Sequence, residues 1–275
     1  MTAPRSITPD KVRAPAMAGK FYPGDPAELR DLISILLAQP RPPKTEAAPK
    51  AIIAPHAGYI YSGPIAASAY AQFAPARDLI KRIILLGPSH YIPFRGLAIP
   101  SVEAFATPLG TIPLDLGALR QIKALPQVCV LDEAHEREHS LEVQLPFLQM
   151  VLASFTLLPL AVGEAAPDEV AQVLEMLWGG SETRFVISSD LSHYHDLQVT
   201  RRLDHATARA IEGLQAAALD EGSACGRIPI GGMLQAAQHR GLHARTLDLR
   251  TSGDTAGPRD RVVGYGAFAF QESAG

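Results

Sequence analysis

Cysteine is scarce in this sequence of 275 residues, which contains only Cys129 and Cys225. Two cysteines cannot cross-link a chain of this length into a disulfide framework, so we expect a hydrophobic core and a reducing compartment. An excess of one charge is also missing, because 25 basic and 28 acidic residues leave a net charge of −3. Without a basic excess, neither nucleic acid nor a membrane surface is an expected partner.

No segment combines the features of a membrane span or a signal peptide. Residues 51–76 contain no Asp, Glu, Lys or Arg and would be long enough to cross a bilayer. However, Pro55, Pro64 and Pro75 interrupt the segment and would leave backbone groups unpaired in lipid. The basic N-terminus, residues 1–13, is not followed by an apolar signal core. These absences predict a soluble, cytoplasmic protein.

Hydrophobic residues make up 47% of the chain and charged residues 19%, which excludes a disordered protein. Short apolar runs alternate with amphipathic stretches. The expected strands are Ala51–Ala54, Arg82–Leu86, Val128–Leu131, Thr156–Ala161, Arg184–Ser188, Arg245–Leu249 and Val262–Phe270. One helix is expected to begin at Pro26, directly after Asp25. The other expected helices are Pro64–Phe73, Leu116–Leu125, Leu141–Leu152, Pro167–Leu177, Gln198–Leu214 and Ile230–Arg240. The alternation predicts an α/β fold with a mixed central sheet flanked by helices. We expect residues 1–12 to be a flexible tail and residues 13–275 to form one domain.

Histidines follow three of the expected strands. His56 comes after the run 51–54, His90 after the run 82–86, and His193 and His195 after the run 184–188, with Asp190 just before them. Ligands of open α/β sheets bind beyond the carboxyl ends of the strands. We therefore expect His56, His90 and His193 to converge on one pocket, although a single histidine after a strand is more often a structural residue.

A second histidine pair matches a zinc-protease motif literally. The segment His135-Glu136-Arg137-Glu138-His139 has the HExxH spacing, which on a helix places both imidazoles on one face. Its surroundings are polar, and the apolar helix pattern begins only at Leu141. We therefore predict that this is not a zinc-protease helix, that His135 points toward solvent, and that His139 supports the pocket from behind.

The two cysteines differ in their surroundings. Cys129 lies in an apolar strand pattern and is expected to be a small buried side chain. Cys225 lies in a loop of small residues, 221–226, ahead of a helix, where glycines allow close approach of a ligand and a helix start could lower the pKa of the thiol. The sequence has no GxSxG, P-loop, CxxC or GxGxxG motif, so the usual serine-hydrolase, nucleotide and thioredoxin chemistries lack support.

Several ordered motifs together resemble one family. They are Arg13-Ala14-Pro15, Gly19-Lys20-Phe21-Tyr22-Pro23, Pro55-His56-Ala57-Gly58-Tyr59, Leu86-Gly87-Pro88-Ser89-His90, Glu138-His139-Ser140-Leu141-Glu142, Ser188-Ser189-Asp190-Leu191-Ser192-His193-Tyr194, Ala224-Cys225-Gly226 and Arg261-Val262-Val263-Gly264-Tyr265-Gly266. The sequence resembles the Memo family, whose bacterial and archaeal members are called AmmeMemoRadiSam system protein B. The resemblance extends from about Arg13 to Phe270.

The resemblance implies a fold similar to the class III non-haem iron dioxygenases, with a metal site at the strand carboxyl ends. The resemblance implies that His56, His90 and Cys225 are the metal ligands. It also implies that Asp190 and His193 orient ligands or move protons in the pocket. The dioxygenases use two histidines and a carboxylate, whereas a thiolate favours copper(I), zinc or a redox-active iron.

The expected function is therefore that of a metal-binding redox protein with an open two-histidine, one-cysteine site. The expected cofactor is iron(II) or copper(I), with zinc as a further candidate. In the expected mechanism His193 is the acid–base group and Asp190 holds an imidazole in one tautomer. The alternative is a non-catalytic module that binds a peptide or small ligand in a vestigial dioxygenase-like pocket. The bacterial family name also implies a functional link to a radical SAM enzyme.

Overall fold

The computed structural model describes residues 8–40 and 47–272. The strands of its central sheet are β2 (Ala51–Ala54), β3 (Arg82–Pro88), β4 (Leu97–Ile99), β7 (Val128–Val130), β8 (Thr156–Val162), β9 (Thr183–Ser188), β10 (His193–His195), β11 (Leu242–Thr251) and β12 (Val262–Glu272). Within the described residues these nine strands have the order β10-β12-β2-β9-β3-β8-β4-β7, with β11 paired to β12. The sheet is mixed, as the sequence predicted, because β12 and β4 run antiparallel to their neighbours β2 and β8.

The centre of this sheet positions the candidate site. The strands β2, β9, β3 and β8 are parallel neighbours. Every residue of β2 and β9 is buried, as expected for parallel strands that are covered on both faces. His56, Asp190 and His90 each come two residues after the last residue of β2, β9 and β3. Parallel strands end at the same edge of a sheet, so this topology brings three polar side chains from distant segments together.

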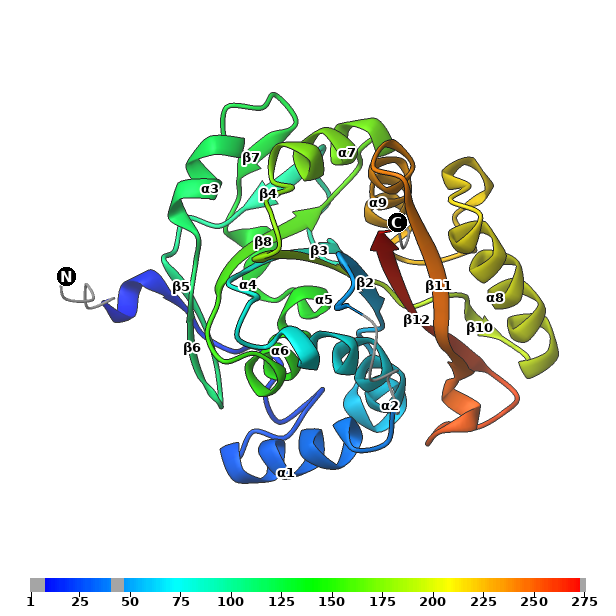
Figure 1. The fold of residues 1–275 in the computed structure, drawn as a ribbon. Coiled ribbons are helices and arrows are strands. Elements are labelled where there is room, and N and C mark those ends of the chain that lie inside the picture. Colours follow the sequence, from blue (N-terminus) through cyan, green and yellow to red (C-terminus); the bar gives the residue numbers. More distant parts are fainter. Residues whose placement is uncertain (1–7, 41–46, 273–275) are drawn as a thin grey trace.

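Helices cover both faces of the sheet (Figure 1). They are α1 (Pro26–Leu37), α2 (Tyr59–Tyr70), α3 (Leu116–Ile122), α4 (Glu133–Glu136), α5 (His139–Glu142), α6 (Leu145–Val151), α7 (Pro167–Met176), α8 (Leu197–Glu212) and α9 (Arg227–His239), with short 3-10 turns at Pro9–Lys11, Ala71–Ala76, Ala216–Ala218 and Ser252–Asp254. On one face α7 and α9 pack together, and α9 contacts β3 and β9. On this same face α8 packs against β11 and β12. On the other face α2 contacts β2, β11 and β12 and is backed by α1.

The predicted elements compare well with the observed ones in the parallel core and less well elsewhere. The strand Ala51–Ala54 is confirmed, and the helix after Asp25 is confirmed with that aspartate as its N-cap. The single helix expected over residues 141–152 is wrong, since α5 and α6 are separate and Pro146 lies in the first turn of α6. The short strand β4 was not predicted, and neither were β10 and the hairpin strands of the second sheet.

The N-terminal segment belongs to this second sheet. Its order is β1 (Val12–Arg13), β5 (Ala104–Thr107) and β6 (Gly110–Pro113), with β1 parallel to β5. Regular structure thus begins at Pro9, earlier than the predicted tail allows, while residues 1–7 of that tail lie outside the described residues. Among the described residues no helix has the length and apolar character needed to cross a membrane.

Candidate metal centre

A cavity of about 830 Å³ opens at the carboxyl edge of the sheet. It brings together side chains from the loops after β2, β3 and β9, from the start of α5 and from the loop before α9. The chemically reactive ones are His56, His90, His139, Asp190, His193 and Cys225. The structure therefore places all five residues to which the sequence assigned roles around one cavity, while those roles stay predictions.

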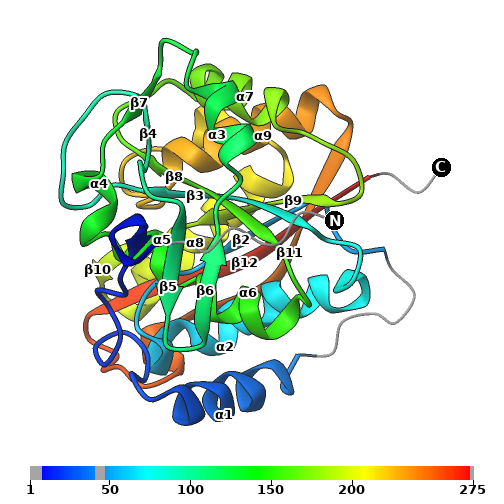
Figure 2. The ribbon, with the colours of Figure 1, turned by 90° about the vertical axis from the view of Figure 1, so that its left-hand side faces the viewer.

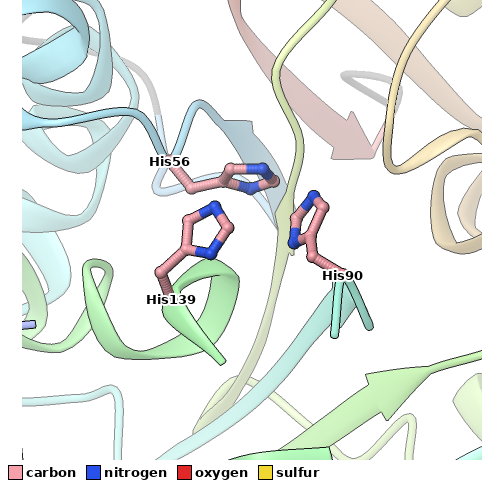
Figure 3. A group of neighbouring side chains, drawn as sticks. All are labelled: His56, His90 and His139. Atoms are coloured by element: carbon pink, nitrogen blue, oxygen red, sulfur yellow. The ribbon is translucent and has the colours of Figure 1, made fainter. Parts of the chain in front are cut away.

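Three imidazoles form the core of this cavity. One ring nitrogen from each of His56, His90 and His139 lies within 4.8 Å of the other two, a grouping that could hold a metal ion. Figure 3 shows the three rings facing one another, from the loop after β2, the loop after β3 and the start of α5. His56 is buried, His139 is partly buried and His90 is open to solvent. The site is thus closed on the sheet side and accessible on the other.

The tautomer of His56 is set by a buried hydroxyl. The Oγ of Ser188 donates a hydrogen bond to the carbonyl oxygen of Ser140 at 2.5 Å and lies 2.9 Å from His56 Nδ1. Because the hydroxyl proton is already used, Ser188 must accept from an Nδ1–H of His56. The lone pair is then on Nε2, which faces the cavity. Burial also lowers the pKa of His56 well below its ordinary value, so the ring is neutral and able to bind a metal.

The tautomer of His90 is set by a carboxylate. His90 Nδ1 lies 2.8 Å from Glu138 Oε1, and the backbone N–H of His90 donates to Oε2 of the same side chain at 2.6 Å. Burial opposes ionisation of Glu138, but the hydrogen bonds from His90 and Ser140 outweigh it and lower the pKa of Glu138 to about 2. An ionised Glu138 accepts from His90 Nδ1–H and leaves Nε2 free. Such carboxylate–histidine pairs typically orient metal-binding imidazoles.

His139 was predicted only to support the pocket from behind, whereas the structure places it in the pocket itself. Its ring centroid lies 4.5 Å from that of His90 and 5.3 Å from that of His56. Burial and the neighbouring histidines lower the pKa of His139 to about 4. Its Nδ1 is buried without a hydrogen-bond partner and lies 3.3 Å from Glu138 Oε1 with poor geometry. A buried nitrogen without a partner is suited to a metal ion.

Cys225 lies on the other side of His56. Its Sγ is 3.2 Å from His56 Nε2 and 3.6 Å from the carbonyl oxygen of Asp190. Burial, together with the carboxylate of Asp190, raises the pKa of the Cys225 thiol to about 12, so the metal-free side chain is a thiol. A tetrahedral ion with bonds of about 2.1 Å to nitrogen and about 2.3 Å to sulfur separates the two atoms by about 3.6 Å. The observed distance brings Cys225 close to His56, but within the described residues the structure groups His56 and His90 with His139 and not with Cys225.

Asp190 and His193 line the same cavity at different depths. Asp190 is buried, and its Oδ1 accepts a hydrogen bond from the backbone N–H of His56 at 2.8 Å. It therefore fixes the backbone of His56, whereas the ring of His56 is oriented by Ser188, which the sequence did not indicate. Burial raises the pKa of Asp190. His193 is partly exposed on the short strand β10 and lies nearer the solvent.

The prediction that His135 points toward solvent is wrong. His135 is on α4 and only 3% exposed, with Nε2 at 3.0 Å from the carbonyl oxygen of Ala98. His139 begins α5, so the two histidines do not share a helix and the HExxH match does not form a zinc-protease helix. Cys129 is only half buried, on β7 and away from the cavity.

Burial of His135 predicts a pH-dependent stability. Burial lowers the pKa of His135 from 6.5 to about 4, so the unfolded chain binds this proton more readily. We expect the free energy of unfolding of the metal-free protein to be highest above pH 6.5 and to fall by roughly 3 kcal/mol, from this residue, as the pH drops to 4. Urea unfolding at several pH values, with and without the substitution His135→Leu, measures it. An equally steep pH dependence in both proteins would contradict the assignment.

The fold and the cavity define a class: an α/β protein with a candidate metal centre at the carboxyl edge of its sheet. Residues 13–269 match the family described as "Memo-like protein", and the chain belongs to this family. It is 36% identical over 273 residues to a MEMO1 family protein of Aquifex aeolicus, and the alignment covers 94% of this chain and 99% of that protein. It is 37% identical over 287 residues to one of Saccharolobus solfataricus, with the same coverage. The resemblance seen in the sequence motifs is thus confirmed.

Proposed function

We propose that this protein is a metal-dependent redox protein that binds iron(II) or copper(I) through His56, His90 and Cys225. The observation that carries the proposal is the fixed orientation of two imidazoles, each with Nδ1 engaged and Nε2 free toward one cavity. His139 is the additional donor that the structure brings to these ligands. Zinc would suit the same nitrogen and sulfur donors.

The roles of the remaining residues follow from their positions. Iron(II) or copper(I) held by His56, His90 and Cys225 would supply one-electron redox chemistry and an open position for a ligand. Asp190 keeps His56 in place through the backbone N–H of that residue. His193 lies at the cavity wall, where an imidazole can exchange protons with a bound molecule and with solvent near neutral pH. The name AmmeMemoRadiSam system protein B, used for bacterial and archaeal members of the family, supports a functional link to a radical SAM enzyme.

The experiment starts from protein purified without chelator, with elemental analysis of the metal content. We expect about one iron or copper ion per chain, and oxygen consumption when a reductant and iron(II) or copper(I) are added. Loss of the metal on substitution of His56 and His90 by alanine, and its retention in His135→Ala, would show that the metal is in the cavity. Absence of stoichiometric metal, together with no binding in titrations, would contradict the proposal.

A second candidate function is binding without catalysis. The cavity volume of about 830 Å³ is far larger than a metal ion and a diatomic ligand require, and it is in the range typical of sites for drug-sized molecules. Its rim carries the exposed Tyr194, whose ring is stacked under the Arg261 guanidinium at 4.9 Å. A peptide or small molecule could occupy this space. Stoichiometric metal without oxygen consumption under any reductant would favour this candidate.

A further inference from the structure

A buried carboxylate holds the segment of residues 13–22, which we call the N-terminal strap. The strap runs past α5 before α1 begins (Figure 2). Glu142 on α5 accepts hydrogen bonds from four groups of the strap. The donors are Arg13 Nη1 at 2.5 Å, the backbone N–H groups of Ala16 and Met17 at 2.9 and 2.8 Å, and the Tyr22 hydroxyl at 2.5 Å. Both oxygens of this carboxylate are therefore fully used.

The ion pair inside this arrangement is almost fully removed from water. The Glu142 side chain is 0% exposed and the Arg13 side chain 7%. Removing two charges from water is costly, and a buried ion pair often stabilises a fold no better than apolar residues of similar size. The pair instead selects a single arrangement of the strap on α5. In any other arrangement either Arg13 or Glu142 would be a buried charge without its partner.

The same arginine also holds the segment that carries two elements of the candidate metal centre. Arg13 Nε donates to the carbonyl oxygen of His135 at 2.7 Å, and Nη2 donates to those of Glu136 and Glu138 at 3.3 and 3.2 Å. Glu138 orients His90, and His139 is the next residue. The backbone that sets both histidines is therefore fixed from behind by Arg13.

The strap also contacts the candidate site directly. The ring of Phe21 lies 4.9 Å from the ring of His139 and lines the cavity. The carbonyl oxygen of Phe21 accepts a hydrogen bond from the backbone N–H of Tyr59 at 2.8 Å, close to the loop that carries His56. The strap thus closes one wall of the cavity and presses against one of its three imidazoles.

We propose that Arg13 and Glu142 are positioning residues of the candidate metal centre. They hold the Glu138–His139 backbone and the Phe21 wall in the arrangement that presents His90 and His139 to a metal. The inference rests on the proposed function for its effect on metal affinity, but the orientation of His90 is measurable without a metal.

The experiment uses Arg13→Met/Glu142→Met, which removes both charges and keeps apolar packing, and Tyr22→Phe, which removes one hydrogen bond. Two quantities are measured: the dissociation constant of iron(II) without oxygen, and the imidazole tautomers of the metal-free protein by nitrogen NMR at pH 8. We expect the double variant to bind iron(II) about 10–100-fold more weakly, as is typical when a partner of a metal ligand is lost. We expect His90 to become a mixture of tautomers, while His56, held by Ser188, keeps its Nδ1–H form. Tyr22→Phe should change both quantities in the same direction and by less.

The matched control is Lys50→Met. Lys50 is also a buried cation, 7% exposed, and it donates to the carbonyl oxygens of Trp178, Gly180 and Thr183. It precedes the amino end of β2, whereas His56 follows the carboxyl end, so this substitution should lower stability and leave both quantities unchanged. If wild type binds iron(II) and the folded double variant matches it in affinity and His90 tautomer, the inference is overturned. If wild type binds no metal, the proposed function fails, and the His90 tautomer still decides whether the pair has a positioning role.

Discussion

Substitution of His56 and His90 by alanine should nearly abolish metal binding. In this variant both imidazoles with a preset Nε2 lone pair are absent, and of the three grouped histidines only His139 remains, with Cys225 beside the vacated His56 position. We expect affinity for iron(II) and copper(I) to fall by at least about 100-fold, beyond the loss typical of removing a supporting partner. Titration of each ion into the purified variant, with fluorescence or absorbance detection, measures the effect.

The control for this variant is His135→Ala. His135 is also a buried histidine, but its ring contacts the carbonyl oxygen of Ala98 and lies outside the cavity lining. It should lose stability and keep its metal content. If His135→Ala loses the metal while the His56 and His90 variant retains it, the metal centre has been assigned to the wrong histidines.

The parallel core was accessible from the sequence because its signal is local. The run at residues 51–54 is short, apolar and followed by Pro55, and the run at 82–86 has the same character, so each predicts a buried strand with a loop after it. Once the strands are parallel neighbours, the edge at which His56 and His90 meet follows from topology alone. The local sequence pattern and general rules of sheet topology were therefore sufficient to predict that the two histidines and Asp190 lie at the same edge of the sheet.

His139 shows where such reasoning fails. Its position depends on the break between α4 and α5 at residues 137–138, and the polar residues around this break give no period that distinguishes a loop from a solvated helix. The available signal was that Glu138 lies beside it, since a carboxylate next to a histidine is a common support for metal ligands. His135 failed for a related reason: its burial comes from Arg13 and Ala98, which are distant in the sequence.

The supporting residues were invisible for the same physical reason. Arg13 and Glu142 are 129 positions apart, and Ser188 is 132 positions from His56. A serine at the end of an apolar strand or a glutamate within a short helix is most often structural, so neither residue type nor spacing identifies it. The meeting point of His56 and His90 can be predicted from strand ends, but the groups that set the tautomers of these histidines require the fold.

Cys225→Ser separates copper(I) from iron(II) most clearly. The substitution keeps the approximate size of the side chain and replaces a soft sulfur with a hard, poorly ionising hydroxyl. Affinity for copper(I) should fall by at least about 100-fold, whereas iron(II) binding should weaken by only about 10-fold, because His56, His90 and His139 remain as harder nitrogen donors. Competition titrations with both ions measure the ratio, with Cys129→Ser as the control, since that cysteine lies on β7 away from the cavity. Cys225→Glu should restore iron(II) binding if the longer side chain fits the loop, because two histidines and one carboxylate suit this ion.

The number of protons released on metal binding provides an independent check of the same ligand. Burial and Asp190 raise the pKa of the Cys225 thiol to about 12, so at pH 8 it must lose a proton when it binds a metal. The pKa values of His56 and His139 are lowered by burial, so these rings are already neutral at pH 8 and release none. Calorimetry in buffers of different ionisation enthalpy should therefore give about one proton more for wild type than for Cys225→Ser, and wild-type affinity should weaken as the pH falls. The contradicting outcome is that wild type, Cys225→Ser and Cys129→Ser release the same number of protons and bind both ions with the same affinity. Cys225 would then only pack beside the histidines, and the metal would be assigned to the three imidazoles alone.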